Sequence, residues 1–166
     1  IRKRNADLFI GRGASKDEAK QVIRAYIAAI SFADYCLGRV VAEVDRLGLR
    51  QNTIMVFVCD HGYQLGEKGK WSKAGSLFEM GTRIPLIIAM PGASGNGKVC
   101  FHTVQSLDIY PTIMQLCNLQ LPAGTPGLGL EGTSLTPLLQ NPAAPWDQPP
   151  YSVWSEDGTT LWGTAI

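Results

Sequence analysis

Residues 53–61 read T-I-M-V-F-V-C-D-H, an apolar run that ends in an acid and an imidazole. The run is rich in β-branched residues and is apolar on both of its faces. A strand with two apolar faces is typical of a parallel sheet that is covered on both sides. We therefore predict an interior strand over residues 53–59, with Asp60 and His61 at its carboxyl end.

The segment before this strand has the pattern of one long amphipathic helix. Ser15 and Glu18 form a capping box, in which each side chain can satisfy a backbone N–H of the first turn. Apolar residues then recur in steps of three and four as far as residue 47, and Gly48 follows where a helix commonly ends. We predict a helix over residues 15–47 that packs on one face of the sheet.

The segments after the strand continue an α/β pattern. Residues 84–90 form a second apolar run, residues 106–118 read as a helix, and residues 121–150 are rich in Pro and Gly. Residues 151–154 and 160–162 read as short strands. The order of helix, strand, loop, strand and helix predicts an α/β domain with a mostly parallel sheet flanked by helices.

Composition excludes several classes of function. The chain has 166 residues, about the size of one domain, and a net charge of +1, which gives no sign of a nucleic-acid partner. No segment approaches the roughly 18 apolar residues of a membrane span. None of the four cysteines lies in a C-x-x-C pair, which argues against a zinc ribbon. The chain begins without Met and ends in a predicted strand, so we expect a fragment.

Asp60 and His61 are the first candidates for chemistry. Functional groups in open α/β sheets gather beyond the carboxyl ends of the strands, and Gly62 is predicted to turn the chain sharply so that the two side chains converge. A carboxylate oxygen and an imidazole nitrogen can share a divalent ion. The tripeptide alone leaves open a second interpretation, a carboxylate that caps the next turn beside a surface histidine.

The following loop, G-E-K-G-K-W-S-K over residues 66–73, carries three lysines and Trp71. Ammonium groups beside a metal favour an anion-binding loop, but a solvated basic loop has the same composition. Trp71 either lines a pocket or packs beneath the loop. Further along, Glu79 and Arg83 are predicted to form a structural ion pair.

Taken together, these stretches resemble the sulfatase family of the alkaline phosphatase superfamily, and in particular its iduronate-2-sulfatase-like branch. Two stretches carry the resemblance: D-H-G-Y-Q-L-G-E-K-G-K-W-S-K and S-L-F-E-M-G-T-R-I-P-L-I-I-A-M-P-G. Three more agree in order: A-Y-I-A-A-I-S-F-A-D, S-L-D-I-Y-P-T-I-M-Q-L-C and L-E-G-T-S-L-T-P-L-L.

The resemblance implies the alkaline phosphatase-like α/β fold and hydrolysis of sulfate esters. Residues 1–146 would belong to the catalytic domain, and residues 147–166 would begin a smaller subdomain. Asp60 and His61 would be ligands of a single calcium ion, and Lys73 would hold the substrate sulfate. Many sulfatases have Asn in place of His61, which leaves the identity of the ion slightly open. Lys68 and Lys70 match no ligand of the family and are predicted to be solvated.

The nucleophile of the family, a formylglycine made from Cys or Ser in a C-x-P-x-R-type motif, has no match in this sequence. The paired aspartates that complete the metal site are also missing. The resemblance therefore implies the second half of such an enzyme, which would be inactive alone and bind calcium weakly. A sulfated sugar or polysaccharide is the expected substrate class, and an exported or lysosomal compartment is expected by analogy with the branch.

Two other functions stay open. A phosphatase, phosphodiesterase or phosphonate hydrolase of the same superfamily also uses an Asp-His pair, commonly around two zinc ions with more histidines. This chain has only His61 and His102, which argues against two zinc ions. A non-catalytic binding protein that keeps the fold is the other alternative, and an upstream C-x-P-x-R motif would separate it from an enzyme.

Overall fold

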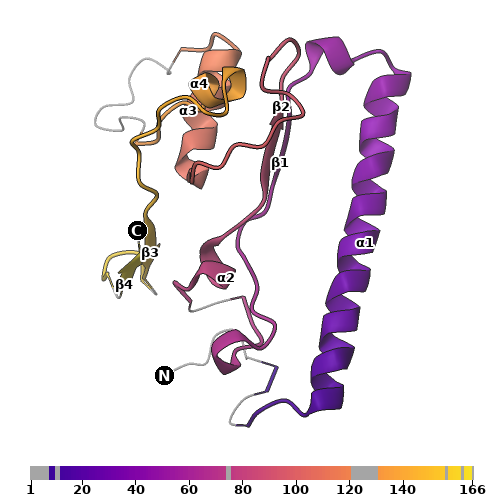
Figure 1. The fold of residues 1–166 in the computed structure, drawn as a ribbon, viewed down its shortest axis with the longest axis vertical. Coiled ribbons are helices and arrows are strands. Elements are labelled where there is room, and N and C mark those ends of the chain that lie inside the picture. Colours follow the sequence, from indigo (N-terminus) through magenta and orange to yellow (C-terminus); the bar gives the residue numbers. More distant parts are fainter. Residues whose placement is uncertain are drawn as a thin grey trace.

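The computed structural model describes residues 8–9, 12–73, 76–120, 131–155, 157–161 and 163–165. The helices are α1 (Lys16–Arg46), α2 (Glu79–Thr82), α3 (Ile109–Leu116) and α4 (Thr136–Gln140), and the strands are β1 (Met55–Val58), β2 (Leu86–Ala89), β3 (Ser152–Trp154) and β4 (Gly163–Ala165). Short 3-10 turns are η1 (Arg50–Asn52), η2 (Glu67–Gly69) and η3 (Ser106–Asp108). Figure 1 shows β1 and β2 between α1 on one side and α3 and α4 on the other.

Helix α1 begins and ends where the sequence predicts. The backbone N–H of Glu18 donates to Ser15 Oγ at 3.3 Å, and the N–H of Ser15 donates to Glu18 Oε2 at 2.9 Å. At the other end Leu47 is the C-cap, and Gly48 has a φ of 67°. This left-handed conformation favours glycine and stops the helix.

The strands pair differently from the prediction. β1 and β2 are antiparallel, with Met55 opposite Ala89 and Val58 opposite Leu86, and β3 and β4 are antiparallel as well. The predicted parallel pairing is therefore wrong for the described strands. A parallel pair needs a crossover that returns the chain along the sheet. Among the described residues of the connection from β1 to β2, η2 and the four-residue α2 are the regular elements, and neither is long enough to carry the chain back along the sheet. The chain therefore enters β2 near the end of β1.

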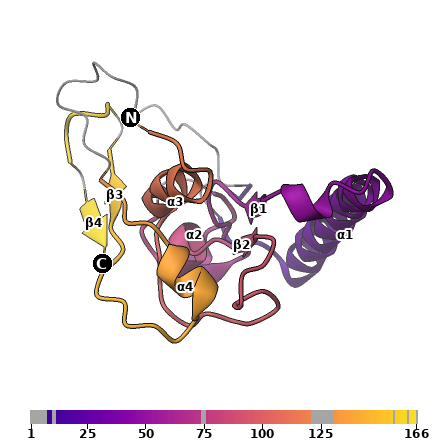
Figure 2. The same cartoon turned by 90° about the horizontal axis from the view of Figure 1, so that it is seen from above.

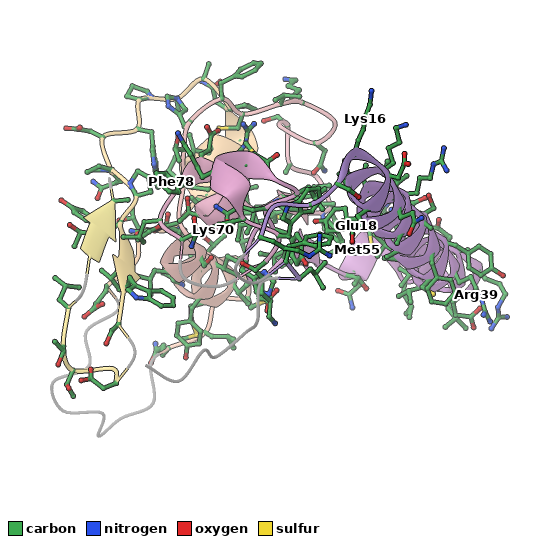
Figure 3. The ribbon with its side chains drawn as sticks, turned by 90° about the horizontal axis from the view of Figure 1, so that it is seen from below. Lys16, Glu18, Arg39, Met55, Lys70 and Phe78 are labelled. Atoms are coloured by element: carbon green, nitrogen blue, oxygen red, sulfur yellow. The ribbon has the colours of Figure 1, made fainter. Side chains whose placement is uncertain are left out.

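The predicted packing of α1 is seen only in part: Val22, Tyr26, Val41 and Val44 are half-buried, and the Tyr26 ring lies 5.4 Å from the Tyr63 ring just after β1. No residue of α1 is buried, and Ile27, Ile30 and Val40 are each more than half exposed. In both views α1 lies at one edge, and the Arg39 side chain points away from the molecule (Figures 2 and 3). Val58 of β1 is 41% exposed, against the predicted burial. Length explains the mismatch, because a 31-residue helix is about 46 Å long and a four-residue strand spans about 13 Å.

Buried side chains lie mainly around α3 and α4. The Asp108 carboxylate, which is 1% exposed, accepts from the N–H groups of Gln105 at 2.9 Å and Thr133 at 2.8 Å. Thr112 Oγ1 donates to the Asp108 carbonyl and accepts from the N–H of Leu135 at 2.8 Å. These bonds fix the segment before α4 against the start of α3.

The hairpin β3–β4 lies within residues 147–166, the expected start of a smaller subdomain. It is tied to the rest of the chain by the N–H of Tyr151, which donates to Gln105 Oε1 at 3.2 Å. The domain boundary after residue 146 stays a prediction.

Candidate active site

Asp60 and His61 follow directly on β1, as predicted. His61 Nδ1 lies 2.8 Å from the Gly62 carbonyl oxygen, and His61 Nε2 lies 3.4 Å from Asp60 Oδ2. Because a carbonyl oxygen only accepts, we assign the proton of the neutral ring to Nδ1, which leaves a lone pair on Nε2. The Asp60 side chain is 85% exposed. Two electron-rich atoms therefore lie close together at an open surface, as two ligands of one cation would.

Gly62 has a role that differs from the predicted one. It does not have a positive φ, so the corner does not depend on a backbone conformation special to glycine. Its N–H donates to the Gly81 carbonyl at 2.9 Å, and a Cβ at Gly62 would lie 2.2 Å from the Met80 carbonyl oxygen. Glycine is needed at this position because the backbone of α2 lies too close for a Cβ atom. The hydrogen bond from Gly62 to Gly81 holds the backbone next to Asp60 and His61 against α2.

The segment after His61 runs beside the segment before Lys73. The Tyr63 hydroxyl donates to the Trp71 carbonyl at 3.3 Å, and the Gln64 N–H donates to the Ser72 carbonyl at 3.1 Å. Lys73 comes next and is exposed. The structure thus brings together the two segments that carry the predicted site residues, and the role of the Lys73 ammonium stays a prediction.

Trp71 packs beneath the loop. It is 7% exposed, and its indole lies so close to Gly66 that a Cβ there would be 2.9 Å from the ring. The Phe9 ring meets it edge-on, with 5.5 Å between the ring centroids. Of the two interpretations of Trp71, the structure supports packing, which anchors the backbone two residues before Lys73.

The other two lysines of the loop differ in their exposure. The Lys68 ammonium lies 5.5 Å from the centroid of the Phe78 ring, a cation–π distance, and Lys68 has a φ of 54°. Lys70 is half-buried, and Figure 3 shows it in the same part of the molecule as Phe78. Lys68 is exposed, in line with the predicted solvated charge, whereas the half-burial of Lys70 differs from that prediction because the loop folds onto the start of α2.

The predicted ion pair between Glu79 and Arg83 is present. Arg83 Nη1 donates to Glu79 Oε1 at 2.9 Å across one turn, and both side chains are exposed. An exposed pair of this kind contributes little to stability.

Gln64 is a residue that the sequence did not indicate. Its side chain is completely buried, and its Nε2 donates to Ser76 Oγ at 2.9 Å. A glutamine between Tyr63 and Leu65 reads as an ordinary loop residue, and no local pattern signals its burial.

Within the part of the chain that the structure describes, no group of three or more His, Cys, Asp or Glu side chains could hold a metal ion. The role of Asp60 and His61 as metal ligands stays a prediction.

Comparison with known families identifies the chain. The family model described as Sulfatase matches residues 4–119, which is more than half of the sequence. The chain belongs to the sulfatase family. The match includes both segments of the candidate site.

Three comparisons illustrate the relationship of this sulfatase chain to known proteins. A sulfatase of Formosa agariphila is 45% identical over 103 residues, which cover 62% of this chain and 20% of the relative. Human iduronate 2-sulfatase is 29% identical over 134 residues, covering 66% and 24%. A solved structure of the protein BT4656 with its substrate D-glucosamine-2-N,6-O-disulfate has a TM-score of 0.73 at 29% identity, covering 88% of this chain and 30% of that one.

The structural likeness confirms the predicted fold class, the alkaline phosphatase-like α/β fold of sulfatases. The chain spans about a fifth to a quarter of the curated relatives named above.

Proposed function

We propose that this chain is part of a sulfatase that hydrolyses sulfate esters of a sulfated sugar or polysaccharide. In this proposal Asp60 and His61 are ligands of one calcium ion, and Lys73 binds the sulfate. The observation that carries it is the family match across residues 60–73, where hydrogen bonds join the segment after His61 to the residue before Lys73.

The geometry of Asp60 and His61 fits a shared cation. Calcium–ligand distances are about 2.3–2.6 Å, so two donors 3.4 Å apart can bind one ion at roughly a right angle. The exposure of Asp60 leaves room for further ligands and for a sulfate oxygen. Calcium prefers oxygen donors, and the imidazole of His61 is a nitrogen donor. Metal analysis of the purified protein therefore has to identify the bound ion. When bound, the ion would neutralise charge on the sulfate oxygens.

Lys73 would supply a second positive charge. A lysine ammonium acts as a compact point charge and can approach a sulfate oxygen without the rigid geometry of arginine. Its contribution would be largest as the bridging oxygen departs and negative charge develops. The formylglycine nucleophile implied by the resemblance is not assigned to any cysteine of this chain.

The substrate class is proposed from the relatives. The structure with the TM-score of 0.73 contains a disulfated glucosamine as its own substrate, which supports a sulfated sugar here. Among the described helices, none has the length and apolar character needed to cross a bilayer. The exported or lysosomal compartment stays a prediction.

The proposal is tested in the natural gene product that carries this sequence, with an aryl sulfate as substrate. Lys73→Ala should lower kcat/KM by roughly 10²–10³-fold, the scale for losing one charge-stabilising donor. Lys68→Ala is the matched control on the same loop and should lower kcat/KM by well under about tenfold, because it removes an exposed charge that steers the anion and a surface contact with the Phe78 ring. Bound calcium should equal that of the parent in both variants.

A second arm tests the ion. Asp60→Asn should reduce the calcium bound at equilibrium, measured by calorimetry and metal analysis, whereas the exposed helix variant Asp34→Asn should not. Parent-like activity of Lys73→Ala, or a better turnover of aryl phosphate than of aryl sulfate, would contradict the proposal.

A further inference from the structure

We propose that Gln64 is a positioning residue, which holds the loop that carries Lys73 in register with the corner of Asp60 and His61. The inference rests on the proposed function, because it assigns Gln64 a role that acts through Lys73.

Gln64 holds the chain on both sides of Lys73. Its backbone N–H donates to the Ser72 carbonyl at 3.1 Å, and its side-chain Nε2 donates to Ser76 Oγ at 2.9 Å. Ser72 precedes Lys73 directly, and Ser76 follows it by three residues. One residue therefore bonds to the chain directly before Lys73, at Ser72, and again three residues after it, at Ser76.

The same contacts connect this segment to α2. Ser76 Oγ also accepts from the N–H of Phe78 at 3.2 Å, and a Cβ at Gly81 would lie 3.0 Å from Ser76 Cβ. Gly81 in turn accepts from the N–H of Gly62, directly after His61. Gln64, Ser76 and α2 thus form one connected unit, which sets where Lys73 lies relative to Asp60 and His61.

The burial of Gln64 indicates a role in geometry. Its side chain is completely buried, and its Oε1 has no hydrogen-bond partner among the described residues. A buried acceptor without a partner opposes folding. An apolar side chain of similar size would fill the space without this cost, but it could not bond to Ser76 Oγ. The side-chain amide of Gln64 therefore serves to hold Ser76, and with it the chain near Lys73, in one position.

The test is a double-mutant cycle of Gln64→Leu and Lys73→Ala in the natural gene product, with kcat/KM for an aryl sulfate as the readout. Gln64→Leu should lower kcat/KM by roughly 10- to 100-fold, the scale of a misplaced catalytic group. In the Lys73→Ala background it should have almost no further effect, because two residues that act through one interaction are not additive. Ser76→Ala, a milder change, should behave in the same way.

Gln115→Leu is the matched control, since Gln115 is exposed on α3, and it should keep parent-like activity. The rate of tryptic cleavage after Lys73 in the native protein is the second readout. It should rise for Gln64→Leu and Ser76→Ala but not for Gln115→Leu, and it does not depend on catalysis.

Equal losses from Gln64→Leu in both backgrounds would show a general effect on the fold and overturn the inference. Unchanged tryptic cleavage would overturn it as well. Parent-like activity of Lys73→Ala would instead overturn the proposed function, and the cleavage rates would still decide whether Gln64 holds the loop. Should Gln64→Leu not fold, Ser76→Ala carries both readouts.

Discussion

Helix α1 and the unit formed by α3 and α4 lie on opposite sides of β1 and β2 and are held in place in different ways (Figure 1). α1 has 31 residues and a complete capping box, yet none of its residues is buried. α3 and α4 have eight and five residues, yet Asp108, Thr112, Leu135 and Leu138 around them are all buried. In this chain a helix with strong capping residues in its sequence is therefore not the helix with the most buried side chains.

The ion pairs at the two ends of α1 are short in sequence, and the Tyr26 ring also lies 5.4 Å from the ring of Tyr63 in the loop after β1. Arg12 pairs with Glu18 at 2.6 Å, and Arg46 pairs with Glu43 at 2.5 Å, all exposed. By contrast, the hydrogen bond from the Thr133 N–H to Asp108 spans 25 residues. We therefore expect substitutions at the exposed positions of α1 to change the stability of that helix alone. Substitutions at the buried positions around α3 and α4 should lower the stability of all the segments that pack there.

The largest expected effect comes from Asp108→Ala. The substitution leaves two N–H groups without their charged acceptor, which should cost about 3 kcal/mol of unfolding free energy. The measurement is urea denaturation. Asp34→Ala, at an exposed site on α1, is the control and should change stability by less than about 0.5 kcal/mol. Equal unfolding midpoints for the two variants would break the comparison.

A pair of Gly→Ala substitutions should change stability in opposite directions. At Gly132 a Cβ would lie 2.1 Å from the Leu107 carbonyl oxygen, so Gly132→Ala should destabilise by about 2 kcal/mol through overpacking. At Gly38, within α1, nothing lies within 4 Å of the added Cβ. Gly38→Ala should therefore stabilise by up to about 1 kcal/mol through helix propensity.

The measurement is the thermal unfolding midpoint of each glycine variant, compared with that of the parent protein. A loss of stability in Gly38→Ala would mean that α1 has a close neighbour at this position, and that its exposed face is covered in the protein under study.

The smallest expected effect is the pH dependence at the start of α1. Hydrogen bonds from Arg12, and then from Ser15, lower the pKa of Glu18 from its usual 4.5 to about 2. Since the folded pKa is the lower one, the stabilisation is present above pH 4.5 and is lost as pH falls through about 2. The protection of the first-turn amides, taken as the ratio of the intrinsic to the observed exchange rate at each pH, should fall in this window, and Glu18→Gln should remove the dependence. Protection that follows the same pH profile in both proteins would refute this origin.

Part of the candidate site was predictable. The apolar run before Asp60 and His61 placed them at the end of β1, and the spacing to Lys73 carried the family resemblance. The role of Gly62 was not predictable, because its need for glycine comes from the close approach of the Met80 carbonyl. Burial of Gln64 was not predictable either, because its partners, Ser72 and Ser76, lie eight and twelve residues away.

The sequence by itself determined the elements whose causes are local. The capping box of Ser15 and Glu18 and the glycine after Leu47 set the limits of α1, since neighbouring residues satisfy the free backbone groups of a helix end. Only the tertiary structure decided the antiparallel pairing of β1 with β2 and the incomplete burial of the apolar face of α1. Hydrophobic periodicity shows which face of an element is apolar, but not which segment lies against it. That choice depends on the length and path of the connection between residues 59 and 85.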